Sequence, residues 1–313
     1  MGLVDGRVVI VTGAGRGIGR AHALAFAAEG ARVVVNDIGV GLDGSCSGAA
    51  GPATSSGHSP AQEVVDAITA AGGEAVTSGA DIADWNGAAS LIQTAVDSFG
   101  GLDVLVNNAG FIRDRMLANT SEEEWDAVIR VHLKGHFATL RHAAGYWRGL
   151  VKEGEARPDS LDARIINTSS GAGLQGSVGQ GNYSAAKAGI AAMTLVAAAE
   201  LGRYGVTVNA IAPAARTRMT EAVFAETMVT PDAGFDAMAP ENVSPLVVWL
   251  GSKESRDVTG KLFEVEGGVI RVAEGWAHGP QIDKGARWDP AELGPVVASL
   301  LGEARPPVGV YGA

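Results

Sequence analysis

The chain has 313 residues, 46% of them apolar and 19% charged, which is enough to bury a substantial core. Its formal net charge of −11 argues against nucleic acid or an anionic membrane surface as a partner, because both require a concentrated positive field. The single cysteine, Cys46, excludes an intramolecular disulfide and a cysteine-based metal cage. Since neither a signal-peptide pattern nor an apolar run of about 18 residues is evident, we expect a cytoplasmic protein. No cluster of His and carboxylate residues suggests a metal.

Short β-branched segments alternate with helical patterns along most of the chain, which is typical of a parallel sheet covered by helices. We therefore predict one α/β domain over residues 1–313, with a Rossmann-type, doubly wound, seven-stranded parallel sheet and helices on both faces. The strands are expected at RVVIV, ARVVVND, GEAVTSGAD, LDVLVNNAG, ARIINTSS, VTVNAIAP and KLFEVEG.

Three segments interrupt this alternation, one of them the charged connection from Lys152 to Asp162, which is expected on the surface. Residues 39–60 form a Gly/Ser-rich loop that contains Cys46 and ends in Ser59 and Pro60, which are typical of a helix cap and first helical residue. Residues 269–313 form a C-terminal extension with a short helical pattern near PAELGPVVASLL. Tails of this kind often cover a neighbouring subunit.

A capping box predicts the start of a long helix in the middle of the chain. Thr120 is followed three residues later by Glu123, and helical periodicity then continues toward Val151.

The first predicted strand runs into a glycine-rich turn and then a helix. The spacing is TGxxxGxG rather than GxGxxG, and the turn consists of Gly13, Arg16, Gly17, Ile18 and Gly19 after Thr12. Glycines let the backbone approach a diphosphate, and the helix N-terminus offers free N–H groups to that charge. A purely steric role for the glycines is the alternative.

An acidic residue ends the second predicted strand. Asp37 lies 18 residues after Gly19, close to the spacing at which a carboxylate binds the adenosine ribose hydroxyls. A carboxylate there would repel a 2′-phosphate, which favours NAD over NADP. Arg16 could attract a 2′-phosphate instead, and Asp37 could merely start a turn.

The stretch GQGNYSAAKAGI places Tyr183 and Lys187 four residues apart at the head of an apolar helix. Four residues is about one turn, so the two side chains share a face. A neighbouring ammonium favours the ionised phenol, which suits general acid/base chemistry. A packed Tyr beside a Lys that reaches solvent is the alternative.

In combination, TGAGRGIG, Asp37, NNAG, Ser170 and YSAAK resemble the short-chain dehydrogenase/reductase family, from about Gly6 to Gly268. Within it, VVVNDIG, EEEWDAVIRVHLKGHF and NAIAPAARTRMTEAV are most similar to the 3-hydroxyacyl-CoA dehydrogenase unit of type 2 peroxisomal multifunctional enzymes, also known as a 17β-hydroxysteroid dehydrogenase. The chain resembles a stand-alone version of that unit.

The resemblance implies a role for each site residue. Tyr183 would be the general acid/base, Lys187 would assist it and bind the nicotinamide ribose, and Ser170, with Ser169 as its adjacent competitor, would hold the substrate oxygen. His132 stands where many members have Asn; it would organise a proton relay or merely pack. The remaining cofactor contacts would come from Asp81, Ile82, Asn108, Ala109, Gly110, Pro213 and Thr217.

The resemblance also implies the reaction, NAD-dependent oxidation of a 3-hydroxyacyl-CoA by a homodimer or homotetramer. A basic rim for CoA is expected from Arg113, Arg115, Arg216 and Arg218, and an apolar lid from Met219, Val223, Phe224 and Met228. A dehydrogenase of free steroids, an NADPH-linked ketoacyl reductase and a noncatalytic NAD sensor are the alternatives.

Overall fold

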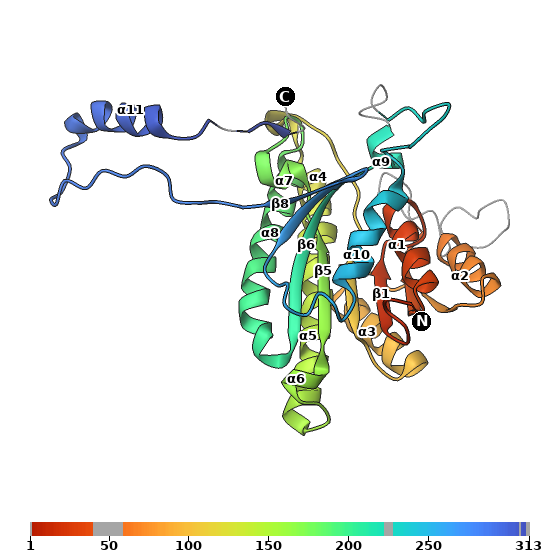
Figure 1. The fold of residues 1–313 in the computed structure, drawn as a ribbon. Coiled ribbons are helices and arrows are strands. Elements are labelled where there is room, and N and C mark those ends of the chain that lie inside the picture. Colours follow the sequence, from red (N-terminus) through yellow and green to blue (C-terminus); the bar gives the residue numbers. More distant parts are fainter. Residues whose placement is uncertain (1, 40–58, 222–227, 307, 311–313) are drawn as a thin grey trace.

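A computed structural model describes residues 2–39, 59–221, 228–306 and 308–310. One eight-stranded sheet forms its centre, in the order β3-β2-β1-β4-β5-β6-β7-β8 (Figure 1). The strands are β1 (Val8–Thr12), β2 (Arg32–Asn36), β3 (Glu74–Ser78), β4 (Val104–Asn107), β5 (Ala163–Thr168), β6 (Val206–Ala214), β7 (Leu262–Glu266) and β8 (Val269–Ala273). The first seven pair in parallel, as the sequence predicts.

The eighth strand corrects the prediction of seven. β8 pairs antiparallel with β7, and Glu266 lies opposite Val269, so only Gly267 and Gly268 connect the two strands. Gly267 has a φ of 54°, in the left-handed region that a two-residue hairpin turn requires. The C-terminal extension therefore begins as part of the sheet.

Helices cover both faces of the sheet, as the doubly wound pattern predicts. α1 (Gly17–Ala28), α2 (Pro60–Ala70) and α10 (Ser244–Leu250) share one apolar cluster with the sheet, while α3 (Trp85–Phe99), α5 (Gly135–Glu153) and α8 (Gly181–Leu201) share the other. Within β1, Val9 and Val11 face the cluster that contains α1, whereas Val8 and Ile10 face the cluster that contains α3. This alternation explains why β1 is apolar throughout: both of its faces are buried.

The long central helix begins one residue later than predicted and is interrupted. Ser121, not Thr120, caps α4 (Glu122–Ile129), and its partner in the capping box is Glu124 rather than Glu123. A π-helical turn, Arg130–Lys134, then separates α4 from α5. Such a turn inserts a residue into the helix and is frequent at functional sites. By contrast, the predicted cap at Ser59 is confirmed, since its hydroxyl accepts a hydrogen bond from the N–H of Gln62.

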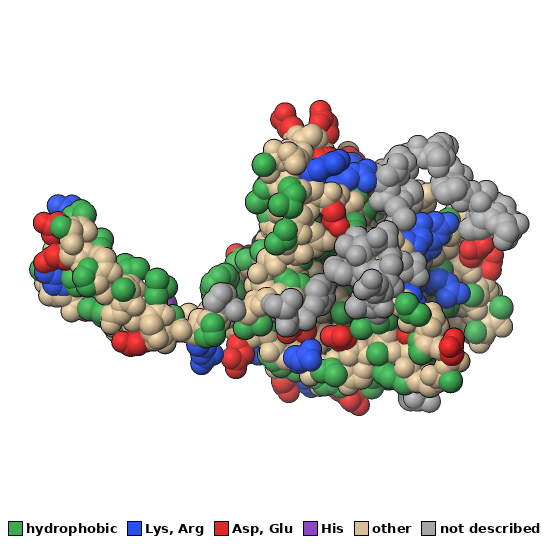
Figure 2. All heavy atoms as spheres, turned by 90° about the horizontal axis from the view of Figure 1, so that it is seen from above, with side chains coloured by type: hydrophobic (Ala, Val, Ile, Leu, Met, Phe, Trp, Pro, Cys, Tyr) green, Lys and Arg blue, Asp and Glu red, His purple; other side chains and the backbone are tan. Residues whose placement is uncertain are grey.

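Shorter elements complete the fold. They are α6 (Pro158–Leu161), α7 (Gly171–Gln175), α9 (Arg218–Glu221) and α11 (Leu293–Glu303), with 3₁₀ turns at Leu117–Asn119, Gly202–Tyr204, Pro240–Val243 and Pro290–Glu292. α11 confirms the predicted helical pattern in the extension. It lies on an arm that projects from the body, and apolar side chains line this arm (Figure 2).

One described helical segment, Gly181–Tyr204, is long and apolar enough to cross a membrane by length and composition alone. It contains α8, which packs against β6 and α7. Three of its polar side chains, Asn182, Lys187 and Thr194, are buried in the fold. The apolar character of α8 is therefore explained by its place in the helical layer on the sheet.

Candidate active site

A cavity of about 560 Å³ opens at the carboxyl ends of the strands. Thr12 ends β1 and Asn107 ends β4, and the strand order reverses between these two neighbours. Ligands of open α/β sheets bind at such a switch point. Every residue that the sequence singles out for catalysis or for the cofactor lies on the wall of this cavity.

The glycine-rich turn packs so closely against the end of β4 that no side chain fits at Gly13 or Gly19. A Cβ on Gly19 would lie 2.2 Å from the carbonyl oxygen of Gly13, and one on Gly13 would lie 2.7 Å from the Cα of Ala109. Asn108 donates a hydrogen bond from Nδ2 to the carbonyl of Thr12, at 2.9 Å, and its own N–H donates to the Thr12 hydroxyl at the same distance. Close packing thus fixes the floor of the cavity.

The N-terminus of α1 faces this cavity and fits a diphosphate. Its N-cap, Arg16, makes no side-chain capping bond, and the first turn holds no acidic residue. Gly17, which has a φ of 54°, and Ile18 also line the cavity. Free amides and a positive helix end with no acidic cap are the environment that an anionic phosphate group requires.

Asp37 is held by the backbone at the end of β2. Its Oδ2 accepts a hydrogen bond from the N–H of Gly15, at 2.9 Å, and its Oδ1 accepts one from the N–H of Gly39, at 2.7 Å. The carboxylate lies on the cavity wall, one strand away from the glycine-rich turn. This position is suited to recognising a pair of hydroxyl groups.

Asp81 and Ile82 lie on the same side of the cavity, after β3. Asp81 accepts a hydrogen bond from the N–H of Ala83 and forms an ion pair of 2.5 Å with Arg130, which belongs to the π-helical turn. Ile82 packs against Gly135, the first residue of α5 after that turn, since a Cβ on Gly135 would lie 2.9 Å from it. Asp81 and Arg130 therefore tie the end of β3 to the π-helical turn.

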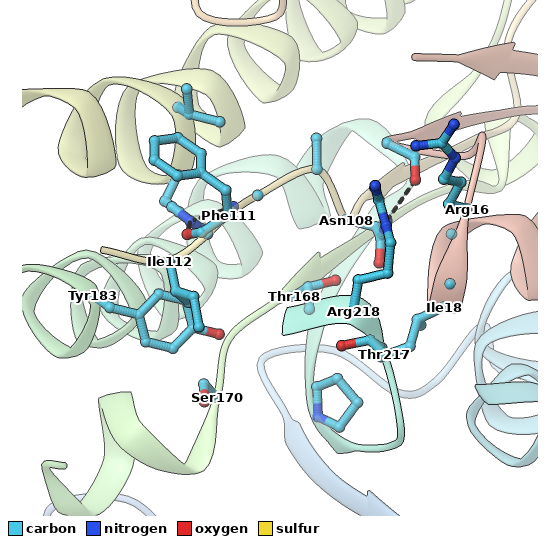
Figure 3. A pocket seen from close by; sticks show the side chains of 18 of the residues that line it. Arg16, Ile18, Asn108, Phe111, Ile112, Thr168, Ser170, Tyr183, Thr217 and Arg218 are labelled. Carbon is cyan, nitrogen blue, oxygen red and sulfur yellow. Dashed lines mark hydrogen bonds between the residues drawn. The ribbon is translucent and has the colours of Figure 1, made fainter. Parts of the chain in front are cut away.

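Tyr183 and Lys187 share one face of α8, as predicted. The Lys187 ammonium lies 5.5 Å from the centre of the Tyr183 ring and donates a hydrogen bond of 2.6 Å to the carbonyl of Thr168. Burial lowers the pKa of Lys187 to about 7. Figure 3 shows the Tyr183 side chain reaching into the cavity, with Ser170 at the same end. The alternative of a Lys that reaches solvent is excluded, because Lys187 is buried.

The two adjacent serines after β5 differ in what their hydroxyl groups do. The Ser169 hydroxyl donates to the backbone carbonyl of Lys187, at 2.9 Å. The Ser170 hydroxyl accepts a hydrogen bond from the N–H of Ala172 as the cap of α7, which leaves its proton available to a ligand. Of the two, Ser170 is the one equipped to donate to a substrate oxygen.

His132 is buried in the π-helical turn beside Tyr183. The two rings meet edge to face, with their centres 5.2 Å apart, and His132 Nε2 lies 2.6 Å from the carbonyl oxygen of Phe111. Burial, followed by the charge of Lys187, lowers the pKa of His132 to about 3. The imidazole is therefore neutral near pH 7. A Cβ on Gly110 would lie 2.2 Å from this ring, so Gly110 gives His132 its space.

These observations agree with the comparisons with known proteins. The family model for short chain dehydrogenases matches residues 7–41 and 46–227. The chain belongs to the short-chain dehydrogenase family. This dehydrogenase is 46% identical over 299 residues to the hydroxyacyl-CoA dehydrogenase ChsB1 of Mycobacterium tuberculosis, covering 93% of this chain and 87% of that one.

Two other proteins are similar to this dehydrogenase. The peroxisomal multifunctional enzyme type 2 of Mus musculus is 44% identical over 266 residues, which cover 85% of this chain and 32% of the mouse protein. The crystal structure of a short chain dehydrogenase from Mycobacterium avium is 77% identical, covers 100% of both chains and has a TM-score of 0.86. The protein is thus an oxidoreductase of a family that uses a nicotinamide cofactor.

Pro213 and Thr217 of this dehydrogenase, which the resemblance assigned to the nicotinamide end, both line the cavity. The predicted apolar lid begins here, but Val223 and Phe224 lie outside the described residues, as does the side chain of Met219. Met228 lines the cavity. The Gly/Ser-rich loop with Cys46 also lies outside the described residues, apart from its two ends.

The predicted basic rim is only partly available to a ligand. Arg115 pairs with Glu124 at 2.8 Å, and Arg216 pairs with Asp236, so these two charges are already offset. Arg113 lies over the ring of Phe111, 5.3 Å from its centre. Arg218 lies between the ends of the cavity marked by Tyr183 and Arg16 (Figure 3).

Some cavity residues of the dehydrogenase were not predicted from the sequence. Phe111 and Ile112 follow the NNAG motif, Gln180 precedes Tyr183 by three residues, and Arg130 comes from the π-helical turn. Phe111, Ile112 and Gln180 have a sequence signal, because the first two adjoin the NNAG motif and Gln180 lies three residues before Tyr183. Arg130 reaches the cavity through tertiary packing.

Proposed function

We propose that the protein oxidises the hydroxyl group of a 3-hydroxyacyl-CoA to the corresponding 3-ketoacyl-CoA, with NAD as hydride acceptor. One observation carries this proposal: Ser170, Tyr183 and Lys187 share a cavity with the glycine-rich turn and with Asp37. The printed functions of the relatives from Mycobacterium tuberculosis and mouse support the substrate class. A noncatalytic NAD sensor would not need this set of side chains.

In this proposal each side chain at the oxygen end has a separate task. Tyr183 accepts the hydroxyl proton of the substrate as general base. Ser170 donates a hydrogen bond to the same oxygen and stabilises the charge that develops on it. Lys187 is fixed by its bond to the Thr168 carbonyl, and in its protonated form it places a positive charge beside the phenol and favours the ionised phenol. A bound nicotinamide cofactor would supply the acceptor for the hydride of the alcohol carbon.

We assign His132 to positioning rather than to proton transfer. With a pKa of about 3, its imidazole does not take up a proton readily near neutral pH. Its edge-to-face contact with Tyr183 and its bond to the Phe111 carbonyl instead orient the phenol and the backbone after the NNAG motif. This assignment favours the packing alternative that the sequence left open.

Asp37 supports NAD rather than NADP as the cofactor. Both of its oxygens are fixed by backbone N–H groups, so the carboxylate cannot easily turn away from a ribose. A 2′-phosphate at that ribose would meet its negative charge. Arg16 lines the same region and keeps an NADPH-linked ketoacyl reductase as the second candidate.

An apolar wall near Tyr183 supports an acyl substrate. Phe111 and Ile112 line the cavity there (Figure 3). Met228 also lines the cavity, and a flexible Met adapts to different chain shapes. Arg113, which lies against Phe111, is the member of the predicted rim that is best placed for the phosphates of CoA. A fatty acyl group and a steroid side chain both fit this description.

An absorbance assay of cofactor reduction tests the proposal. The purified protein is mixed with NAD or NADP and with a panel of 3-hydroxyacyl-CoA thioesters, each matched by its free acid, together with free hydroxysteroids. We expect NADH to form with the thioesters. Turnover of free steroids alone would indicate a hydroxysteroid dehydrogenase. Preference for NADPH and a ketoacyl substrate would indicate the reductase, and no turnover with any pair would contradict an enzymatic role.

We further propose that the enzyme is a cytoplasmic homodimer or homotetramer. Phe137 on α5 and Leu195 and Val196 on α8 are exposed apolar residues on neighbouring helices, and α11 has no buried residue at all. Exposed apolar surface of this extent is typical of a subunit contact. Light scattering of the purified protein would show twice or four times the chain mass, whereas a monomer at assay concentration would contradict this.

A further inference from the structure

Arg218 reaches the cavity from the segment that crosses the start of α1. If Gly17 carried a Cβ, it would lie 3.6 Å from Cγ2 of Thr217, the residue before Arg218. The Thr220 hydroxyl accepts a hydrogen bond from the N–H of Thr217, at 2.8 Å, and donates one of 2.9 Å to the carbonyl of Ala215. These bonds fix the backbone on both sides of Arg218, so its attachment point above the glycine-rich turn is well defined.

The Arg218 side chain interacts with the dinucleotide end of the cavity. In Figure 3 it lies between the ends of the cavity marked by Tyr183 and Arg16, and its charge interacts with Arg16 and Asp37. Arg218 is therefore misplaced for the CoA rim that the sequence suggested, and it faces the N-terminus of α1.

The charges in this region are not balanced. Arg16 and Arg218 contribute two positive charges, and Asp37, whose oxygens already accept two backbone N–H groups, contributes one negative charge. Within the described residues, no carboxylate lies at ion-pair distance from either arginine. The pKa of Arg218 is lowered by burial and then by the charge of Arg16, and it is raised by the charge of Asp37. The two arginines and Asp37 therefore interact electrostatically. The uncapped N-terminus of α1 adds further positive potential.

We propose that Arg218 binds the diphosphate of the dinucleotide from the side opposite to α1 and, together with Arg16, closes a cationic clamp around it. This inference rests on the proposed function, because it presumes that a dinucleotide occupies the cavity. The negative charge of a diphosphate would balance the positive charge of the two guanidinium groups and of the helix end. A guanidinium can also donate hydrogen bonds to two phosphate oxygens at once. Arg218 is thus a cofactor-binding residue in addition to those predicted.

Calorimetric titration with fragments of the cofactor tests this inference without any turnover. The ligands are NADH, ADP, adenosine, 2′,5′-ADP and coenzyme A, and the proteins are the natural chain, Arg218→Met and Arg218→Lys. Arg203→Met is the matched control, because Arg203 lies over the ring of Tyr204 and not on the cavity wall. For Arg218→Met we expect NADH and ADP to bind about tenfold more weakly or worse, as the loss of a charged hydrogen bond predicts.

The other ligands and variants distinguish a diphosphate contact from other roles of Arg218. Adenosine should bind equally to all four proteins, and Arg218→Lys should retain part of the ADP affinity, since it keeps the charge but loses the planar fork. Unchanged ADP affinity in Arg218→Met would overturn the inference, and so would a loss confined to 2′,5′-ADP or to coenzyme A. If the natural chain bound neither NADH nor ADP, the proposed function itself would fail.

Discussion

The two ends of the cavity are built in different ways. At the dinucleotide end the wall is mainly backbone: glycines packed against β4, the first turn of α1, and a carboxylate fixed by two N–H groups. At the oxygen end the wall is made of side chains that come from four separate places, namely Phe111, His132, Ser170 and Tyr183. The first end is recognisable from short sequence motifs, and strand pairing brings these motifs together. The second depends on how α8, β5 and the π-helical turn pack together.

This difference teaches which substitutions should affect binding and which should affect chemistry. A change at the backbone end disturbs the shape of the fold, because a Cβ there meets main-chain atoms. A change at the oxygen end mainly removes a chemical group, although Ser170 also caps α7. Substitutions at the two ends should therefore separate effects on cofactor binding and stability from effects on kcat.

Tyr183→Phe should have the largest effect. It keeps the ring that contacts His132 and Lys187 but removes the hydroxyl group that accepts the substrate proton. We expect kcat to fall by about 10²- to 10⁴-fold, the usual contribution of general acid–base catalysis. NADH affinity, measured by fluorescence titration, should stay the same because the backbone end is untouched. Near-normal turnover would refute the assignment of Tyr183.

Ser170→Ala should reduce kcat by about 10²-fold, because one donor to the developing oxyanion is lost. The same change removes the cap of α7, which costs about 1 kcal/mol of stability. Ser59→Ala is the matched control: it removes the cap of α2 and should cost similar stability without any change in kcat. Steady-state kinetics and urea unfolding of both variants decide this. Equal kcat values for the two variants would argue for a purely structural Ser170.

Gly19→Ala tests the backbone end. The added methyl group would meet the Gly13 carbonyl oxygen and the Asn108 amide, so we expect a loss of about 1–3 kcal/mol in the free energy of unfolding, with weaker NADH binding. Gly149→Ala is its control, since no atom lies within 4 Å of a Cβ there and the residue is inside α5. That change should stabilise the protein by about 0.5–1 kcal/mol. Similar urea midpoints for both variants would contradict the packing described here.

The free energy of unfolding should fall at acid pH because two histidines are buried in their neutral form. Burial lowers the pKa of both His22, in α1, and His132, in the π-helical turn, to about 3. In the unfolded chain they titrate near pH 6.5. Between these two values the unfolded state binds more protons, so the stability that each contributes is complete above pH 6.5 and is lost as pH falls toward 3.

The loss in the free energy of unfolding is expected to reach about 1 kcal/mol per pH unit for each histidine. His22→Asn and His132→Asn should therefore both flatten the decline of the melting temperature between pH 7 and pH 4. Calorimetric scans across this range provide the measurement. Curves parallel to that of the natural chain would show that these histidines are not the groups that titrate on unfolding.

Much of the fold follows from local patterns. The apolar segments predict all seven parallel strands, and their alternation with helices predicts the layers, because a strand buried on both faces must be apolar throughout. The eighth strand was missed because Gly267 and Gly268 look like the end of the domain, whereas the hairpin needs β7 as a template. The shift from Thr120 to Ser121 at the cap of α4 arose because both residues precede a run of glutamates.

The sequence by itself determined the chemistry available to this protein: a glycine turn before a helix, an acid after the next strand, and a Tyr and Lys one helical turn apart. These are short-range sequence patterns. Helical geometry places the Tyr and the Lys on one face, and the pairing of β1 with β2 brings the acid to the glycine turn. Only the tertiary structure decided which charges remain for a ligand. It buried Lys187 and His132, paired Arg115 and Arg216 with acids, and brought Arg218 over the start of α1. Burial and charge pairing depend on residues far apart in the chain, and these meet only once the sheet and its helices have packed.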